Sequence, residues 1–276
     1  MTRPPGVWIN GELCAANEAG VAYDDHGLTV GDGVFETMKL VDGTPFARTR
    51  HLARLRRSAK AVAIEVPGDE TIDGAIAAVC ASGDGTGFLR ITLTSGSGPL
   101  ASHRGEEAST LIVAIRPGSL RTEPTAAFLA PWTRNERGAL AGVKSTSYGD
   151  NVVALRYAER LGGSEAIFAN TEGLLCEGTG SNIFFGLGGK LFTPSLSSGC
   201  LAGVTRELLL EAGVGTEADF HVDDLESATE IFLTSTSREV QPLATFGGRA
   251  LPLAPGPLTA AARRVWLEQI ATQLDP

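Results

Sequence analysis

A polar stretch that carries both proline and glycine divides the chain into two patterned halves. It runs from Arg116 to Pro124 and reads RPGSLRTEP. Such stretches mark boundaries that few contacts cross, and strand and helix patterns alternate on both sides of this one. The sequence therefore predicts an α+β fold, with a small N-terminal domain over residues 1–120 and a larger domain over residues 121–276.

Hydrophobic periodicity places the elements of both halves. In the first half we expect a hairpin turn at Asn10-Gly11, strands at 34–40, 89–93 and 111–115, and a helix over about 49–64. A second helix follows, with Asp69 as the expected N-cap. In the second half we expect strands near 126–130, 165–169, 183–185 and 231–234, with a short strand near Phe220. Helices are expected at about 151–161, 204–212 and 258–273.

Charge and composition exclude several classes of protein. The 276 residues include 23 Lys and Arg against 32 Asp and Glu, a net charge of -9 that argues against nucleic acid or an anionic membrane as the main partner. No apolar run of about 18 residues is present, so no membrane-spanning segment is expected. The opening MTRPP is not followed by an apolar stretch, so no secretory signal is expected either. With four widely spaced cysteines, expected to be free thiols, this composition is typical of a cytoplasmic protein.

Common catalytic motifs are also missing. The sequence has no phosphate-binding P-loop, no zinc-protease histidine pair and no nucleophile elbow. Its four histidines lack metal-ligand spacing, so no metal site is expected. Residues 96–101 are a weak match to a dinucleotide-binding turn, but Pro99 and the lack of a following helix predict an ordinary loop.

Lysine is scarce, and one lysine has unusual neighbours. Only four of the 23 basic residues are lysines, and Lys144 lies among small and hydroxyl residues in ALAGVKSTSY. Burial lowers the pKa of an amine, and a neutral amine can form a Schiff base with a carbonyl. The alternative is a lysine that extends its ammonium group to solvent from a strand end.

Three further segments have the composition of anion or cofactor sites. Residues 198–205 lead directly into a predicted helix whose N-terminal amides can bind an anion, and residues 234–237 are four consecutive hydroxyl residues. Glu177 opens a glycine-rich turn, EGTGSN. Each segment alone is equally consistent with a helix cap or a surface turn. Together, a Schiff-base lysine, a carboxylate and phosphate-binding segments are what pyridoxal 5'-phosphate requires.

The order of these motifs resembles that of the class IV aminotransferases, the fold-type IV pyridoxal phosphate enzymes, and in particular their D-amino-acid aminotransferase and aminodeoxychorismate lyase branch. The resemblance extends from about Gly31 to Pro242. It rests on residues 31–37 (GDGVFET), 51–55 (HLARL), Lys144, 177–182 (EGTGSN), 201–206 (LAGVTR) and 234–236 (TST). It implies a larger domain that is barrel-like and binds the cofactor, and a homodimer whose sites are shared between subunits.

The resemblance also implies roles for individual residues. Lys144 would form the Schiff base and carry the proton, and Glu177 would pair with the pyridine nitrogen. The phosphate would be bound by Arg54, by Thr205 with the Val204 amide, and by Thr236. Arg137, seven residues before Lys144, matches an arginine that lies near the cofactor in some members.

The substrate is less defined by the resemblance. D-amino-acid aminotransferases typically hold the substrate carboxylate with an Arg-x-His motif, which reads Leu100-Ala101-Ser102 here, so we expect His103 or Arg104 to replace it. Phe35 and Thr37 are further candidates for substrate contacts, and this pair resembles aminodeoxychorismate lyase. We therefore expect an enzyme that transfers an amino group to an α-keto acid. The expected amino donors are D-amino acids or (R)-amines. The alternatives are a lyase releasing pyruvate and 4-aminobenzoate, a branched-chain aminotransferase, or a non-catalytic scaffold.

Overall fold

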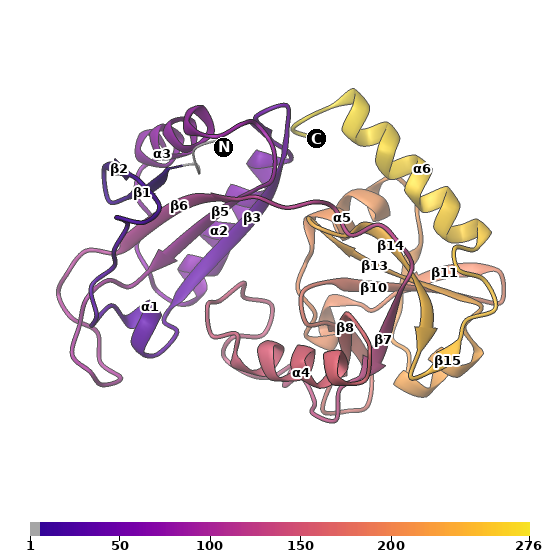
Figure 1. The fold of residues 1–276 in the computed structure, drawn as a ribbon. Coiled ribbons are helices and arrows are strands. Elements are labelled where there is room, and N and C mark those ends of the chain that lie inside the picture. The colour runs from indigo at the N-terminus through magenta and orange to yellow at the C-terminus, as the bar shows by residue number, and fades with distance from the viewer. Residues whose placement is uncertain (1–5) are drawn as a thin grey trace. The chain divides into compact units, whose positions relative to one another are not determined.

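The computed structural model describes residues 6–276, and the opening segment in which we expected no targeting signal lies outside this range. Two compact units are present (Figure 1). The first contains the described residues up to Ser119, together with Val143–Tyr148 and Asp275. The second contains Leu120–Gly142, Gly149–Leu274 and Pro276. The chain thus returns briefly to the first unit at the segment that carries Lys144.

The first unit is built on a six-stranded antiparallel sheet with the order β2-β1-β6-β5-β3-β4. Its strands are β1 (Val7–Ile9), β2 (Glu12–Cys14), β3 (Gly33–Val41), β4 (Thr44–Pro45), β5 (Phe88–Thr94) and β6 (Thr110–Arg116). Its helices are α1 (His26–Thr29), α2 (Arg48–Ala61) and α3 (Asp69–Ser82). The alternation along β3 explains the core, because Val34, Met38 and Leu40 pack against leucines and isoleucines of α2 and α3. The opposite face of β3 carries Phe35 and Thr37.

The second unit contains a nine-stranded mixed sheet that curls into a half-barrel (Figure 1). Its path is β12-β11-β10-β13-β14-β7-β8-β9, and β15 pairs with β14. The strands are β7 (Thr125–Leu129), β8 (Glu165–Ala169), β9 (Leu175–Gly178), β10 (Asn182–Leu187), β11 (Lys190–Thr193), β12 (Thr216–Glu217), β13 (Glu230–Ser235), β14 (Glu239–Phe246) and β15 (Arg249–Ala250).

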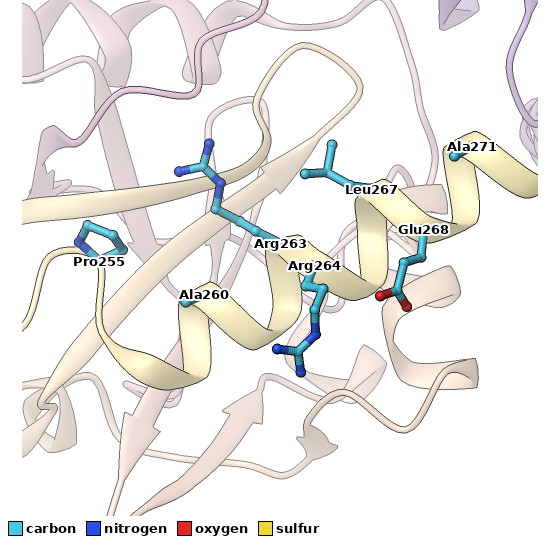
Figure 2. A pocket seen from close by; sticks show the side chains of 7 residues that line it. All are labelled: Pro255, Ala260, Arg263, Arg264, Leu267, Glu268 and Ala271. Carbon is cyan, nitrogen blue, oxygen red and sulfur yellow. The ribbon is translucent and has the colours of Figure 1, made fainter.

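Helices and short turns complete the second unit. They are α4 (Gly149–Arg160), α5 (Val204–Glu211), α6 (Pro257–Thr272) and the 3₁₀ turns η1 (Leu196–Ser198) and η2 (Val222–Ser227). Ile183, Phe185 and Leu233 lie in the main core cluster. The alanines of α4 pack with Phe168 in a second cluster. A hollow along α6, lined by Pro255, Arg263, Leu267 and neighbouring residues, contains none of the candidate site residues (Figure 2).

The predicted fold class is confirmed, and most predicted elements are present. The strand expected at 165–169 is β8, and the helix expected at 204–212 is α5. Two expectations were wrong. Gly68 is the N-cap of α3 and Asp69 is its first helical residue. No strand forms at Phe220, whose ring instead packs edge-on against Phe185, 5.0 Å between centroids.

All four cysteines are free, as expected. Across residues 6–276, no helix has both the length and the apolar character needed to cross a bilayer.

Candidate active site

The candidate residues form two groups, one in each unit. In the first unit, the segment around Lys144 pairs with the edge of β3. The Phe35 amide donates to the Lys144 carbonyl at 2.9 Å, and the Thr146 amide donates to the Gly33 carbonyl at 2.8 Å. The Lys144 amide in turn donates to Ser58 Oγ of α2 at 3.2 Å. The backbone on both sides of the lysine is therefore fixed by β3 and α2.

Glycine allows this close approach. A Cβ atom on Gly33 would lie 2.9 Å from the Leu93 carbonyl oxygen and 2.9 Å from Thr146 Oγ1. Gly31 has φ of +71°, and a Cβ there would lie 2.8 Å from Ser147 Oγ. The GDG sequence at 31–33 thus has a physical role, because it admits the lysine segment against the strand.

Two cations share one aromatic ring on the outer face of β3. Lys144 Nζ lies 4.3 Å from the centroid of Phe35, and the Arg90 guanidinium carbon lies 3.8 Å from it. Tyr148 packs edge-on against the same ring at 5.2 Å. Thr37 is the direct cross-strand partner of Arg90, so Thr37, Phe35 and Arg90 lie on one face.

Arg90 is the residue of this face that the sequence reasoning missed. Its Nε donates to Thr92 Oγ1 at 3.2 Å, and within residues 6–276 its two terminal amino groups have no hydrogen-bond partner. Burial lowers the pKa of Arg90, although the guanidinium stays charged. Its alternation with Leu89 and Ile91 was the available signal, because it predicts a side chain on the face opposite the core.

A buried ionic cluster lies on the other face of β3. Glu36 is fully buried and accepts bonds from Arg54 Nε at 2.7 Å and Nη2 at 2.8 Å. His51 Nδ1 lies 2.7 Å from the same carboxylate. Burial raises the pKa of Glu36, but Arg54 and His51 outweigh it and hold that pKa well below its usual range. Burial lowers the pKa of His51 despite Glu36, so the ring is neutral near pH 7.

The structure places Arg104 and His103 differently from the substrate role expected for them. Arg104 donates from Nε and Nη2 to the Asp32 carboxylate at 2.6 and 2.7 Å. Its Nη2 also donates to the Val62 carbonyl at 2.7 Å, and its Nη1 donates to the Ala63 carbonyl at 2.6 Å. These bonds tie the loop after β5 to the end of α2. His103 is exposed on that loop.

In the second unit, Glu177 of β9 has two defined partners. The Leu201 amide donates to Oε2 at 2.9 Å, and Arg134 Nε lies 3.5 Å from Oε1. The Leu201 carbonyl accepts from Asn182 Nδ2 at 2.8 Å, so Leu201 is held through both its amide and its carbonyl. The carboxylate therefore has a fixed orientation, and the exposed fraction of its side chain is 14%.

The glycine-rich turn after Glu177 is held by hydrogen bonds to the buried carboxylate of Glu165. Glu165 Oε1 accepts from the Thr179 amide at 3.0 Å, and Oε2 accepts from Ser181 Oγ at 2.8 Å. Arg238 Nη2 lies 3.3 Å from Glu165 Oε2 and neutralises it. The hydroxyls of Thr179 and Ser181 thus hold the turn in place. Thr179 and Ser181 are buried while Gly180 is exposed, so the turn is anchored to the interior on one side.

The N-terminus of α5 has no side-chain cap. Gly203 is the N-cap and provides no side-chain bond to the first amides, and Val204 and Thr205 are buried. A Cβ on Gly203 would lie only 2.0 Å from Asn182 Oδ1, so the position requires glycine. Thr234 Oγ1, on β13, is buried without a hydrogen-bond partner among the described residues. Thr236 lies in the turn directly after this strand and is half-buried.

Arg137 lies elsewhere in this unit. Its side chain is 75% exposed and pairs with Glu172 and with Glu136, whose Oε1 lies 3.4 Å from Arg137 Nε. Arg134, three residues earlier, is the arginine that faces Glu177. The sequence offered no signal that separates the two, because both precede Lys144 in one irregular segment.

Comparison with known proteins decides the family. The model of the amino-transferase class IV family matches residues 33–246. The chain belongs to the class IV aminotransferases. Enzymes of this class depend on pyridoxal phosphate. Solved structures that match this chain include a T.th. branched-chain amino acid aminotransferase complexed with N-(5'-phosphopyridoxyl)-L-glutamate (25% identity, TM-score 0.87, covering 98% of this chain and 95% of that one).

Relatives with different named activities are about equally similar to this class IV chain. A Methanocaldococcus jannaschii protein provisionally named a branched-chain-amino-acid aminotransferase is 31% identical, with 89% of each chain covered. D-alanine aminotransferase of Staphylococcus haemolyticus is 30% identical, with 88% and 89% covered. Aminodeoxychorismate lyase of Bacillus subtilis is 27% identical, with 97% and 96% covered. The crystal structure of the Escherichia coli branched-chain aminotransferase has a TM-score of 0.89 at 25% identity, with 96% and 94% covered.

The residues present fit the cofactor of the class. The uncapped helix start at Gly203 and the unpaired Thr234 hydroxyl offer donors to a phosphate group. Glu177 offers a fixed carboxylate for a ring nitrogen, and Lys144 offers a half-buried amine.

Proposed function

We propose that this class IV aminotransferase transfers the amino group of a D-amino acid to an α-keto acid. The observation that carries the proposal is the pairing of Lys144 Nζ and the Arg90 guanidinium on the Phe35 ring. An α-amino acid has its carboxylate one carbon from its amino nitrogen, so it requires a cation beside the reacting amine. Within residues 6–276 the hydrogen bond recorded for Arg90 uses Nε, so its terminal amino groups are available to a carboxylate and Arg90 meets that requirement. Arg104 is already bonded to Asp32 and two carbonyls.

The same proposal assigns the cofactor to both groups of residues. Lys144 would hold it covalently, and Glu177 would pair with its ring nitrogen. Its phosphate is bound by Arg54, by the Val204 amide with Thr205, and by Thr236. Arg137 is the weakest of these candidates, because its side chain is mostly exposed and paired with two glutamates. We also propose a homodimer in the cytoplasm, on the basis of the family and of four free thiols.

The chemistry follows from the roles of these side chains. When bound, the cofactor acts as an electron sink that makes the α-proton of the substrate acidic. Lys144 Nζ would accept the proton that leaves the substrate α-carbon and would hold it for its return. Arg90 orients the substrate through its carboxylate, and the Phe35 ring contacts both cations. Glu177 holds the ring nitrogen in its protonated form.

D configuration is supported by relatives named D-alanine aminotransferase. The test is a substrate profile of the purified protein with D-alanine, L-leucine and an (R)-amine, each with 2-oxoglutarate as acceptor. We expect D-alanine to be the best donor. Dominant transfer from L-leucine, or none from any D-amino acid, contradicts the proposal.

An Arg90→Met variant tests the carboxylate role directly. We expect roughly a 100-fold loss or more in kcat/KM for D-alanine and a change below about threefold for the (R)-amine, because only the acid has a carboxylate to lose. Arg116→Met, on β6 of the same sheet, is the matched control and retains both activities. An equal loss for both donors contradicts the role of Arg90.

A second candidate, aminodeoxychorismate lyase, is favoured by Thr37. Its side chain lies opposite Arg90 on the face that carries Phe35. Release of 4-aminobenzoate from aminodeoxychorismate, without transfer from D-amino acids, supports the lyase. A non-catalytic scaffold predicts a colourless protein. A visible absorbance band that borohydride abolishes excludes that alternative.

A further inference from the structure

Glu177 has a charged neighbour with no role in the scheme above. Arg134 Nε lies 3.5 Å from Glu177 Oε1, and the exposed fractions of the two side chains are 19% and 14%. The Nε atom is buried and makes no hydrogen bond within the described part of the chain. An approach of a few tenths of an ångström would turn this contact into a charge-assisted hydrogen bond.

Arg134 is held in place by three other contacts. Its amide donates to the Ala169 carbonyl at 2.8 Å, which aligns it with the end of β8. Its guanidinium lies over the Phe168 ring, 4.4 Å from the centroid. Its Nη1 donates to Asn151 Oδ1 at 3.2 Å. Asn151 is buried and donates in turn to the Thr179 carbonyl at 2.5 Å.

Two cysteine thiols interact electrostatically with Glu177, and neither adds a negative charge near neutral pH. Burial raises the pKa of Cys176 far above its usual value and raises the pKa of Cys200 to about 11. Both thiols are therefore protonated near neutral pH. Arg134 Nε therefore lies within ion-pair distance of the Glu177 carboxylate, and the two thiols beside that carboxylate are uncharged.

We propose that Arg134 is a positioning residue that keeps Glu177 ionised, so that the proton between this carboxylate and the cofactor ring stays on the ring nitrogen. The inference rests on the proposed function. The partition of that proton depends on the relative basicities of carboxylate and nitrogen. An opposite charge within about 4–6 Å makes a carboxylate roughly 10- to 1000-fold less basic. Arg134 therefore biases the partition toward the nitrogen by a factor in that range.

The test uses holoenzyme reconstituted with pyridoxal phosphate that carries ¹⁵N in its ring. The nitrogen resonance is measured at about pH 7.5 for the wild type, R134Q, R134K and the matched surface control R156Q. We expect the protonated value in the wild type and R156Q. In R134Q we expect the resonance to move at least half of the interval toward the value of the unprotonated cofactor. R134K retains the charge and recovers most of the difference.

Activity provides a second readout. We expect kcat of R134Q to fall about tenfold or more, while KM for the amino donor changes less than about twofold, because the donor does not contact Arg134. An unchanged nitrogen resonance in R134Q, even with lower thermal stability, overturns the proposal and leaves Arg134 a purely structural role. If R134Q does not fold, N151A decides. Loss of the Asn151 support is expected to move the resonance partway in the same direction, and no movement overturns the proposal.

The wild type separates this inference from the proposed function. If it takes up no cofactor, both fail. If it binds cofactor and transfers amino groups but its ring nitrogen is unprotonated, only the role of Arg134 fails.

Discussion

The buried carboxylate of Glu36 provides a sharp test of how the first unit is stabilised. Glu36 is fully buried and accepts two bonds from Arg54, which is 6% exposed, and His51 completes the cluster. A Glu36→Gln substitution keeps the shape of the side chain and removes its charge. It leaves the Arg54 guanidinium buried without a counter-charge.

The expected cost follows from this geometry. Removal of one partner of a buried ion pair costs about 3–5 kcal/mol, because the remaining charge is desolvated without compensation. For chains of this size, 1 kcal/mol corresponds to roughly 2–4 °C in Tm. We therefore expect the Tm of E36Q to be lower by roughly 6–20 °C at about pH 7.

The lowered pKa of Glu36 determines how the Tm difference between wild type and E36Q changes with pH. The pKa of Glu36 is depressed in the folded state, so the unfolded chain binds a proton more readily than the folded one. The stabilisation by Glu36 is complete above the unfolded pKa of about 4.3 and is lost as the pH falls toward the folded value. The difference in Tm between wild type and E36Q should therefore be constant from about pH 6 to 8 and shrink below about pH 4.

Differential scanning calorimetry of the apo-proteins measures this difference without the cofactor. Glu159→Gln is the matched control, because Glu159 pairs with Arg156 on an exposed surface of α4. It should change stability by less than about 0.5 kcal/mol. A Tm within about 2 °C of wild type for E36Q, or a difference that grows toward low pH, refutes the reasoning.

Three further substitutions test the site. Lys144→Ala should abolish the visible absorbance of the reconstituted enzyme and its transaminase activity while far-UV circular dichroism is unchanged, and a retained borohydride-sensitive band contradicts the role of the lysine. Gly203→Ala should weaken cofactor binding about 10- to 100-fold in a fluorescence titration, because its Cβ would lie 2.0 Å from Asn182 Oδ1. Gly180→Ala, with no atom within 4 Å of its Cβ, is the control that should bind normally. Gly33→Ala should lower the free energy of unfolding by about 1–3 kcal/mol in urea titrations, because a backbone carbonyl lies 2.9 Å from its Cβ; an unchanged midpoint contradicts this.

Local pattern predicted most of the elements, and the exceptions have specific causes. No strand was expected at the position of β14, whose sequence contains Pro242, and proline is usually confined to edge strands. In the structure Pro242 lies opposite Phe232 within an internal strand. The strand expected at Phe220 was predicted from an apolar side chain alone. An apolar side chain there is required by the core, but the backbone around it forms no ladder.

The chemistry-bearing residues were predictable where one segment carries the signal, as with Lys144 and the turn after Glu177. Residues whose relevance depends on pairing between distant segments were not. Arg90 gains its place because β5 pairs with β3 in a register that sets it opposite Thr37 and over Phe35. A shift of one residue would turn Arg90 into the core and would be prohibitive for a charged side chain. The register is thus fixed by the apolar alternation on the other face.

Arg104 is a residue that the sequence suggested for the site and that the pairing of distant segments uses elsewhere. From the sequence it is an arginine displaced by a few residues from the position to which the resemblance assigns substrate binding, and that proximity made it a candidate. In the fold, four donor bonds to Asp32, Val62 and Ala63 use its guanidinium to anchor a loop. An arginine bonded to a carboxylate and two carbonyls has little capacity left for a second carboxylate. Arg90 has a single bond to a hydroxyl and is therefore the better candidate for binding the substrate carboxylate.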